Sequence, residues 1–247
     1  KEEAAGHVLE YLGGDRTLSQ LKADMSASAS DGDKDEHIFM KKYRFPVVLA
    51  FLIAFFNQFS GINAFLYYAP RIFEAAGLGE STALLSSIGI GVTNLLFTLL
   101  GIYLIDRLGR RQLMYMGSIG YIVSLALVAA AFMLDWTGIM VPVFLFLFIA
   151  AHAIGQGTVI WVFISEVFPN HLRGSGQAFG TSIHWILAWL IPSSIPVLFS
   201  TIGPGPVFGF FAFMMFLQLL FVHFMMPETK GISLEELSKI LIRKNRD

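Results

Sequence analysis

Six polar side chains fall within a short, otherwise apolar stretch of the sequence. They are Asn57, Gln58, Ser60, Asn63, Tyr67 and Tyr68. On a continuous helix with about 100° per residue, all except Gln58 share a face about 140° wide, and unwinding at Gly61 would turn Gln58 toward the same side. Each amide offers two donors and an acceptor, so this group suits an uncharged polyol. The alternative is that these groups brace neighbouring helices.

Further polar and aromatic residues interrupt the later apolar stretches. Asn94 is flanked by small residues, and Trp161 follows a glycine-flanked Gln156. The Trp161 ring could cover the apolar face of a sugar, although an isolated tryptophan is more often a core residue. His152 and His184 are each more often hydrogen-bonded structure than proton carriers. No carboxylate or thiolate accompanies them within an apolar stretch, so we expect no metal site.

Two loops combine acidic and basic side chains. Their residues are Asp106, Arg107, Arg110, Arg111, Glu166 and Arg173. Arginine forks pair bidentately with carboxylates. The spacing of Glu166 and Arg173 favours a breakable latch between helices, whereas the simpler interpretation is an anchor of positive charge beside a membrane.

The distribution of charge places most of the chain in a lipid bilayer. The chain has 247 residues, 55% apolar and 14% charged, and no cysteine, which excludes a disordered chain and a disulfide scaffold. With a net charge of −1, nothing suggests a basic surface for nucleic acid or a strongly acidic partner. Residues 1–45 carry 16 charged residues and the tail from Pro227 carries 9, leaving 10 for positions 46–226.

The uncharged runs predict six membrane-spanning helices, because about 20 apolar residues cross a bilayer. The expected spans are 46–69, 82–105, 113–134, 140–164, 176–199 and 206–226. The last uncharged run is too long for one helix and is expected to fold back at the Gly and Pro residues of 203–206. The predicted fold is therefore an all-α membrane protein.

Six spans put both ends of the chain on one side of the membrane. With both termini in the cytoplasm, 16 of the 17 Lys and Arg residues lie inside and only Arg71 lies outside. We divide the chain into a cytoplasmic linker with a short helix (1–45), a six-helix bundle (46–226) and a cytoplasmic tail helix (227–247). In the linker, 7–12 resembles a helix and 26–35 a flexible segment.

Four motifs in this order resemble the sugar porters of the major facilitator superfamily. Residues 57–63 with Tyr67 and Tyr68 are similar to the family's Q-Q-x-S-G-I-N-x-x-x-Y-Y signature. Residues 106–111 resemble its D/E-R-x-G-R-R loop, 166–173 its E-x6-R motif and 227–231 its P-E-T-K-G motif. The resemblance covers nearly the whole chain but only half of the family's architecture, spans seven to twelve.

The resemblance implies transport of a monosaccharide by alternating access in a cell (inner) membrane, with proton-coupled symport, an N-terminal six-helix half as partner and no cofactor. It implies that Gln58 and Asn63 hydrogen-bond the sugar, that Asn94 joins them and that Trp161 lies under the sugar ring. The charged loop residues would form a salt-bridge cluster that breaks on inward opening. Asn57 stands where the family has glutamine and His184 where it has Asn or Gln, so glucose, xylose, galactose or a polyol remain open.

Several alternatives remain at this stage. An uncoupled facilitator or a non-transporting sugar sensor would share the binding residues, although the short tail argues against a sensor. An intramembrane enzyme using His152 and His184 would need a nucleophile or metal, and none is evident, so we expect no enzyme. No acidic residue lies at mid-depth, so a coupling carboxylate would belong to the other half, unless His184 carries the proton. We expect no transport by this chain alone.

Overall fold

The computed structural model describes residues 36–136 and 138–243, and over these ranges it is helical. Within the described residues, six helical stretches are long and apolar enough to cross a membrane. The first combines the 3-10 turn η1 (Lys41–Tyr43), α3 (Arg44–Phe59) and α4 (Ile62–Ala75). It begins and ends about five residues beyond the predicted span, because Arg44 and the residues after Pro70 remain helical despite their polarity.

The next spans are α5 (Glu80–Leu108), α6 (Arg110–Met133) and a fourth span made of α7 (Met140–His152), the π-helical turn η2 (Ala153–Gly157) and α8 (Thr158–Glu166). After the short η3 (Asn170–Leu172) come α9 (Arg173–Ile202), α10 (Pro204–Phe224) and the tail helix α11 (Leu234–Arg243). The helix α11 falls within the segment predicted as the tail, 227–247. The predicted helix at 7–12 and the flexible segment at 26–35 lie outside the described residues.

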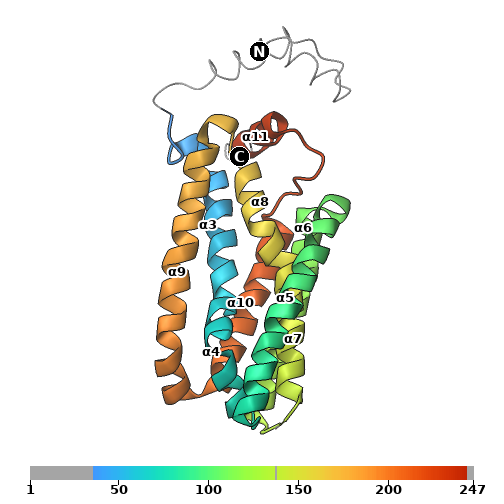
Figure 1. Ribbon diagram of the computed structural model, residues 1–247. Coiled ribbons are helices and arrows are strands. Elements are labelled where there is room, and N and C mark those ends of the chain that lie inside the picture. The colour runs from blue at the N-terminus through green and yellow to red at the C-terminus, as the bar shows by residue number, and fades with distance from the viewer. Residues whose placement is uncertain (1–35, 137, 244–247) are drawn as a thin grey trace, which may run out of the picture.

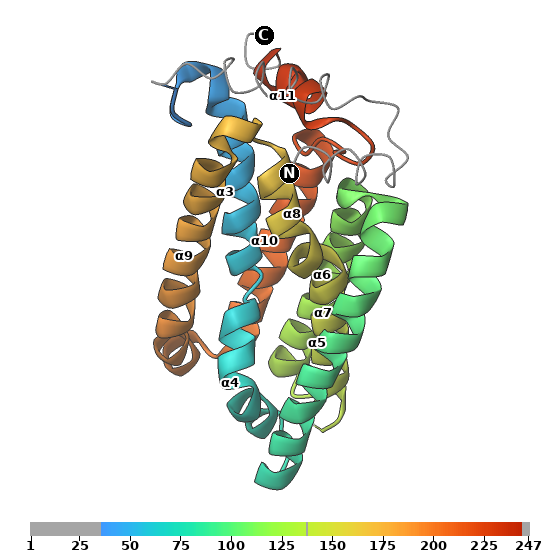
Figure 2. The same cartoon turned by 45° about the horizontal axis from the view of Figure 1, so that its top comes forward.

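The interrupted first span runs through the middle of the bundle. In both views it lies between α9 on one side and the group of α5, α6 and α7 on the other (Figures 1 and 2). The start of α3 and the tail helix α11 lie at the same end of the bundle, as expected for an even number of spans (Figure 1). We call this the α11 end.

The helices are held together by phenylalanine packing and by close backbone approach. Phe65 on α4 meets Phe148 on α7 edge to face, with ring centroids 5.7 Å apart. Gly117 on α6 faces Gly155 in η2, and a Cβ added to either glycine would come within 3 Å of the other's Cα. Small residues allow helices in lipid to approach this closely.

A buried polar contact joins α6, the π-helical turn and α10. The amide of Gln156 donates to Oε1 of Gln218, whose own amide donates to Oγ of Ser118 at 2.8 Å. All three side chains are fully buried, and Oε1 of Gln156 has no partner among the described residues. The π-helical turn places Gln156 in the packed interior of the bundle.

Candidate sugar site and the loop cluster

The break in the first span positions the amides. Gly61 has φ +80°, a left-handed conformation that glycine adopts without strain, and it separates α3 from α4. Ser60 secures the break, because its hydroxyl donates to the main-chain oxygen of Asn57 at 2.6 Å and accepts from the amide of Ile62 at 3.3 Å. Ser60 is fully buried, so it braces the bend rather than facing the amide hollow as the helical-face argument predicted.

The three amides form a hydrogen-bonded row across this break. Asn63 donates from Nδ2 to Oε1 of Gln58 at 2.9 Å, and Gln58 donates from Nε2 to Oδ1 of Asn57 at 2.9 Å. The same Nε2 lies 3.1 Å from Nδ1 of His184 on α9. Gln58 is 1% exposed, so its orientation is fixed before any ligand arrives.

This row lines a polar hollow of about 250 Å³, which we call the amide hollow. It is lined by Asn57, Gln58, Ile62, Asn63, Leu66, Asn94, Thr98, His152, Gly157, Ile160, Trp161 and His184. Six of the predicted binding residues therefore meet here: Asn57, Gln58, Asn63, Asn94, Trp161 and His184. The Trp161 and His184 ring centroids are 4.9 Å apart. None of the described residues lining the hollow is an Asp, Glu, Lys or Arg.

Tyr67 and Tyr68 do not join the amide hollow. They line a different hollow of about 360 Å³ together with Trp185 and Trp189 of α9. Placing them on one face with the amides assumed a continuous helix, and the non-helical backbone at Gly61 changes the direction of every side chain after it. The prediction that these tyrosines share the amide site is therefore corrected by the structure.

Two lining residues were missed or given another role. Thr98 follows Asn94 by one helical turn on α5, so its spacing could have identified it. His152 was interpreted as structural, yet it lines the hollow while its Nδ1 contacts the Tyr121 hydroxyl at 2.5 Å. Nothing in the sequence near His152 indicates its contact with Tyr121, because Tyr121 lies on another helix.

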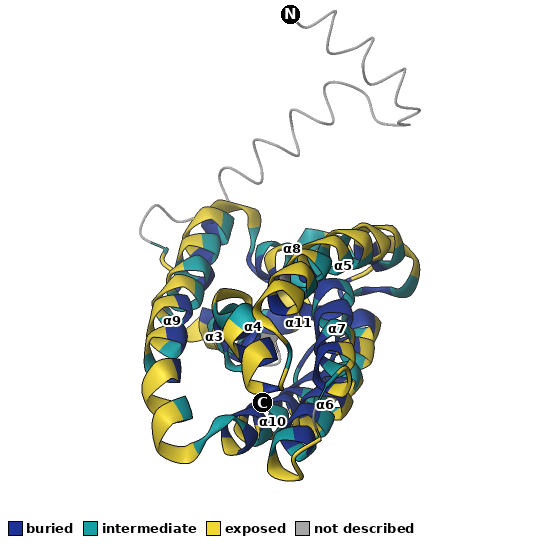
Figure 3. Ribbon diagram, turned by 60° about the horizontal axis from the view of Figure 1, so that its bottom comes forward, coloured by how far each residue is buried: buried dark blue, intermediate teal, exposed yellow. Residues whose placement is uncertain are grey.

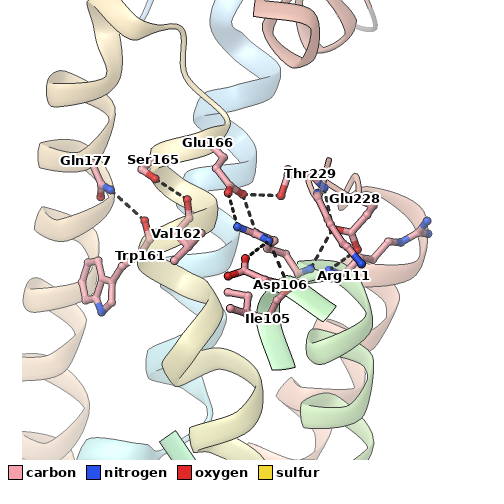
Figure 4. A network of polar contacts seen from close by, with 12 residues as sticks. Ile105, Asp106, Arg111, Trp161, Val162, Ser165, Glu166, Gln177, Glu228 and Thr229 are labelled. Atoms are coloured by element: carbon pink, nitrogen blue, oxygen red, sulfur yellow. Dashed lines mark hydrogen bonds and ion pairs between the residues drawn. The ribbon is translucent and has the colours of Figure 1, made fainter. Parts of the chain in front are cut away.

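The charged loop residues meet at the α11 end, and we call them the loop cluster. Arg110 at the start of α6 holds Glu166 at the end of α8 through two contacts, Nη2 to Oε1 at 2.8 Å and Nε to Oε2 at 3.2 Å. Asp106 lies 3.3 Å from Arg110 but its side chain is 81% exposed. The pair between Arg110 and Glu166, both largely buried, is therefore the main link (Figure 4).

Glu228 and Thr229, which follow α10, complete the loop cluster. The carboxylate of Glu228 accepts from the main-chain N–H groups of Arg110 at 3.0 Å and Arg111 at 3.1 Å, so it caps the N-terminus of α6. Thr229 donates to Glu166 at 2.5 Å (Figure 4). The motif containing both residues had been noted, but a role in the cluster had not been predicted.

The other predicted members have different partners. Arg173 donates to Oδ1 of Asn170 at 2.6 Å, whereas Glu166 contacts Arg110. Arg107 lies over the ring of Tyr103, with its guanidinium carbon 4.0 Å from the centroid.

Among the described residues, Arg111 forms no ion pair. Its guanidinium donates to the main-chain oxygens of Val222 at 3.1 Å and His223 at 2.6 Å. Of the predicted cluster, Asp106, Arg110 and Glu166 are therefore the members joined by ion pairs among the described residues.

A second charged contact ties the start of the described chain to the loop before α9. Glu36 accepts from Lys42, from the Tyr43 hydroxyl at 2.6 Å and from Nε2 of His171 at 2.9 Å. The hydrogen bonds from Lys42 and then Tyr43 lower the pKa of Glu36 from 4.5 to about 2. Glu36 therefore holds this segment against the bundle as a carboxylate.

Comparison with known proteins identifies the family. The sequence profile described as "Sugar (and other) transporter" matches residues 1–241. The arabinose-proton symporter of Bacillus subtilis is 36% identical over 91% of this chain and 47% of its own length. The D-xylose-proton symporter of Escherichia coli is 31% identical over 97% of this chain and 50% of its own length.

Solved structures agree with the sequence matches. The proton:xylose symporter of the major facilitator superfamily bound to 6-bromo-6-deoxy-D-glucose is 31% identical, with a TM-score of 0.83 over 97% of this chain and 52% of that one. The inward-open xylose transporter from E. coli gives a TM-score of 0.73 over 96% of this chain and 50% of that one. The chain spans about half the length of the relatives it matches. It therefore belongs to the sugar transporter family of the major facilitator superfamily and has the fold of one six-helix half.

Proposed function

We propose that this chain is the C-terminal half of a carrier that moves a monosaccharide across a cell membrane by alternating access. The observation that carries the proposal is the amide hollow, where neutral donors and acceptors of α3, α4, α5 and α9 converge beside Trp161. Neutral polar groups at membrane depth are costly unless they have partners or line a wet cavity. Their convergence on one hollow supports a ligand of many hydroxyls and no charge.

Transport in this proposal needs no covalent chemistry. A sugar hydroxyl exchanges its bonds to water for bonds to Gln58, Asn63 and Asn94, while the Trp161 ring, 38% exposed, covers an apolar face of the sugar. The two amide hydrogens of Gln58 already face Asn57 and His184, and its Oε1 accepts from Asn63, so Gln58 presents the remaining acceptor site of Oε1 in a preorganised position. Preorganisation reduces the ordering cost of binding.

A second half is needed to close the site. The hollow of about 250 Å³ is below the range of about 300–1,000 Å³ typical of ligand pockets, and Trp161 remains partly open. Only 17% of the apolar stretch of α5 and 22% of that of α9 are buried, against 44–61% in the other spans (Figure 3). We therefore assign the exposed sides of α5 and α9 to contact with an N-terminal six-helix half.

We place the α11 end in the cytoplasm and assign the loop cluster to conformational control. The distribution of Lys and Arg supports this orientation. The pair of Arg110 and Glu166 fastens α6 to α8, and opening of the carrier toward the cytoplasm requires such contacts to separate. Nε of Arg173 is buried without a partner among the described residues, so Arg173 can donate to Glu166 or another acceptor once the contact of Glu166 with Arg110 separates.

Proton-coupled symport is the favoured mode because the arabinose and xylose relatives are named proton symporters. The described lining of the amide hollow contains no carboxylate, so in this proposal the coupling carboxylate belongs to the N-terminal half. The same observation favours an uncoupled facilitator as the second candidate. Proton transport by His184 is a third candidate, and His184→Gln tests it. Loss of pH-driven accumulation with intact sugar exchange would assign the proton to His184.

Sugar counterflow in liposomes tests the proposal. The carrier containing this chain as its C-terminal half is expected to exchange D-xylose, L-arabinose or D-glucose saturably, and Gln58→Ala is expected to abolish exchange. Phe224→Ala, at an exposed position away from the lining of the hollow, serves as the matched control and should retain exchange. Saturable uptake by this chain alone as a monomer would overturn the need for a second half.

A further inference from the structure

A hollow of about 430 Å³ lies between α9, the start of α10 and the end of α3, and we call it the apolar hollow. Each described residue that lines it is apolar except Ser194. The Ser194 hydroxyl donates to the main-chain oxygen of Leu190 at 2.9 Å, so it needs no water as a partner. Apolar cavities without an unpaired polar group stay dry. Water is therefore not the occupant of this hollow.

The apolar hollow has a buried floor and an exposed rim. Ile195 of α9 and Val207 of α10 line the floor and are 1% and 3% exposed. Leu198 and Ile202 of α9 line the rim and are exposed. The described chain therefore leaves the hollow open on one side. An unfilled hollow would cost the floor residues their dispersion contacts on that side.

The apolar hollow extends along one half of the membrane. Its lining on α9 runs from Leu190 to Ile202, the last residue of that helix, which is a stretch of about 18 Å at 1.5 Å per residue. One leaflet contributes about 15 Å of hydrocarbon. The hollow ends beside the turn at Gly203, at the end of the bundle opposite α11 (Figure 1). Its length and position therefore match an acyl chain of a single leaflet.

The apolar hollow and the amide hollow lie on different sides of the central span. The amide hollow includes residues of α5 and α8, whereas the apolar hollow includes residues of α10. In Figure 3, α10 lies on the opposite side of α3 and α4 from α5 and α8. The N-terminal half, assigned above to the exposed sides of α5 and α9, therefore lies away from α10.

Exposed apolar residues continue the rim of the apolar hollow on both helices. Val197 follows this pattern beside Leu198 on α9, and Phe213 follows it one turn after Phe210 on α10. Both lie within stretches that are long and apolar enough to cross a membrane. The hollow is therefore continuous with the surface that the bundle presents to lipid.

We propose that the apolar hollow binds one acyl chain of a membrane phospholipid, from the leaflet at the end of the bundle opposite α11. The acyl chain enters beside Ile202, lies along α9 and packs on Ile195 and Val207. Packing rather than transfer from water supplies the attraction, because the surrounding lipid is equally apolar. The site goes beyond the proposed function, since it lies outside the sugar path and its occupancy does not depend on sugar.

Photolabelling of the full carrier in phospholipid nanodiscs tests the site. The probe is a phosphatidylcholine with a diazirine midway along one acyl chain, and mass spectrometry of peptides locates the adducts. Lipid that only surrounds the bundle reaches exposed residues such as Phe213. An acyl chain in the hollow also reaches the floor, so we expect adducts at Ile195 and Val207 as well.

Filling the apolar hollow with a side chain should displace the lipid. Ser194→Phe places a ring in the hollow, and it is expected to abolish the adducts at Ile195 and Val207 while leaving those at Phe213. Ser194→Ala removes the hydroxyl without filling the space and should retain the floor adducts. Ser200→Phe adds the same ring at an exposed position of α9 outside the lining and should retain them too.

Two results would overturn the proposal. Adducts confined to exposed residues in the unmodified carrier would mean that the N-terminal half or a second copy, rather than lipid, covers the apolar hollow. Floor adducts that persist at full level in Ser194→Phe would mean that the probe reaches the floor by another route. If Ser194→Phe does not fold, Leu198→Trp fills the hollow from its exposed rim and carries the same comparison. Because the readout needs no sugar, absence of sugar exchange would overturn the proposed function and leave this site standing.

Discussion

Replacing Gly61 with alanine should damage both stability and sugar binding, because two separate costs meet at this residue. A left-handed conformation costs an L-residue about 1–2 kcal/mol, and Gly61 has φ +80°. A Cβ at this position would also lie 2.6 Å from Cδ2 of Phe211 on α10, an overpacking that costs about 1–3 kcal/mol. Together, Gly61→Ala should lower the free energy of unfolding by about 2–5 kcal/mol.

The assay is unfolding by SDS in mixed micelles, combined with sugar counterflow. Gly91 on α5 is the matched control, because it is also a glycine in an apolar span but has a helical φ and no atom within 4 Å of an added Cβ. Gly91→Ala should therefore be neutral or stabilising by up to about 1 kcal/mol. The clash term is isolated by adding Phe211→Ala, which should cost less in the Gly61→Ala background than alone.

The reasoning would be refuted if Gly61→Ala were as well tolerated as Gly91→Ala, or if its effect simply added to that of Phe211→Ala. Counterflow gives an independent check, because displacement of α4 should separate Asn63 from Gln58 and weaken sugar exchange. Normal exchange by a Gly61→Ala carrier would mean that the break does not position the amides.

Three further predictions concern polar contacts outside the sugar site. Glu166→Gln and Arg110→Gln should each lower the free energy of unfolding by about 2 kcal/mol. In a double-mutant cycle, the double variant should lose less than the sum of the two single losses. Strict additivity of the two losses would argue against an interaction between Arg110 and Glu166. Because the pKa of Glu36 is lowered to about 2, its contribution to the free energy of unfolding is complete above about pH 4.5 and is lost as pH falls toward 2. In a pH titration of unfolding, Glu36→Gln should remove this dependence. A variant with the same pH dependence as the unmodified protein would show that Glu36 is not its source. Gln156→Leu should lower the free energy of unfolding in SDS by about 1–3 kcal/mol, because it leaves Oε1 of Gln218 unpaired. Adding Gln218→Leu should recover part of this loss. A double variant less stable than Gln156→Leu alone would contradict this reasoning.

The sequence predicted the six spans because hydrophobic length is a strong constraint in lipid, and charge between spans marks their ends. The family, the half-fold and the sugar-transporter relationship were likewise identified correctly from four short motifs. The limits of the first span differ by several residues, because helices can extend through Arg44 and through Pro70 without a change in topology. The placement of the α11 end of the bundle in the cytoplasm stays a prediction.

Side-chain pairing was less accessible to sequence reasoning. Asn57, Gln58 and Asn63 were grouped correctly because they are close in the chain, but Tyr67 was misplaced because a periodic argument cannot follow the backbone through a left-handed glycine. The partner of Glu166 depends on how α6, α8 and the segment after α10 meet in space. Spacing along one segment could not show which arginine of the two loops reaches Glu166.

The central claim is that the amide hollow binds sugar, and protection of an introduced cysteine tests it most directly. The chain has no cysteine, so Leu66→Cys adds a single thiol to it in the lining of the hollow, and Ser81→Cys adds one at an exposed turn of α5 as the control. In the purified carrier in detergent, the transported sugar should slow alkylation of the cysteine at position 66 with a saturable dependence on concentration, and should leave position 81 unaffected. Equal rates at position 66 with and without saturating sugar would contradict the claim.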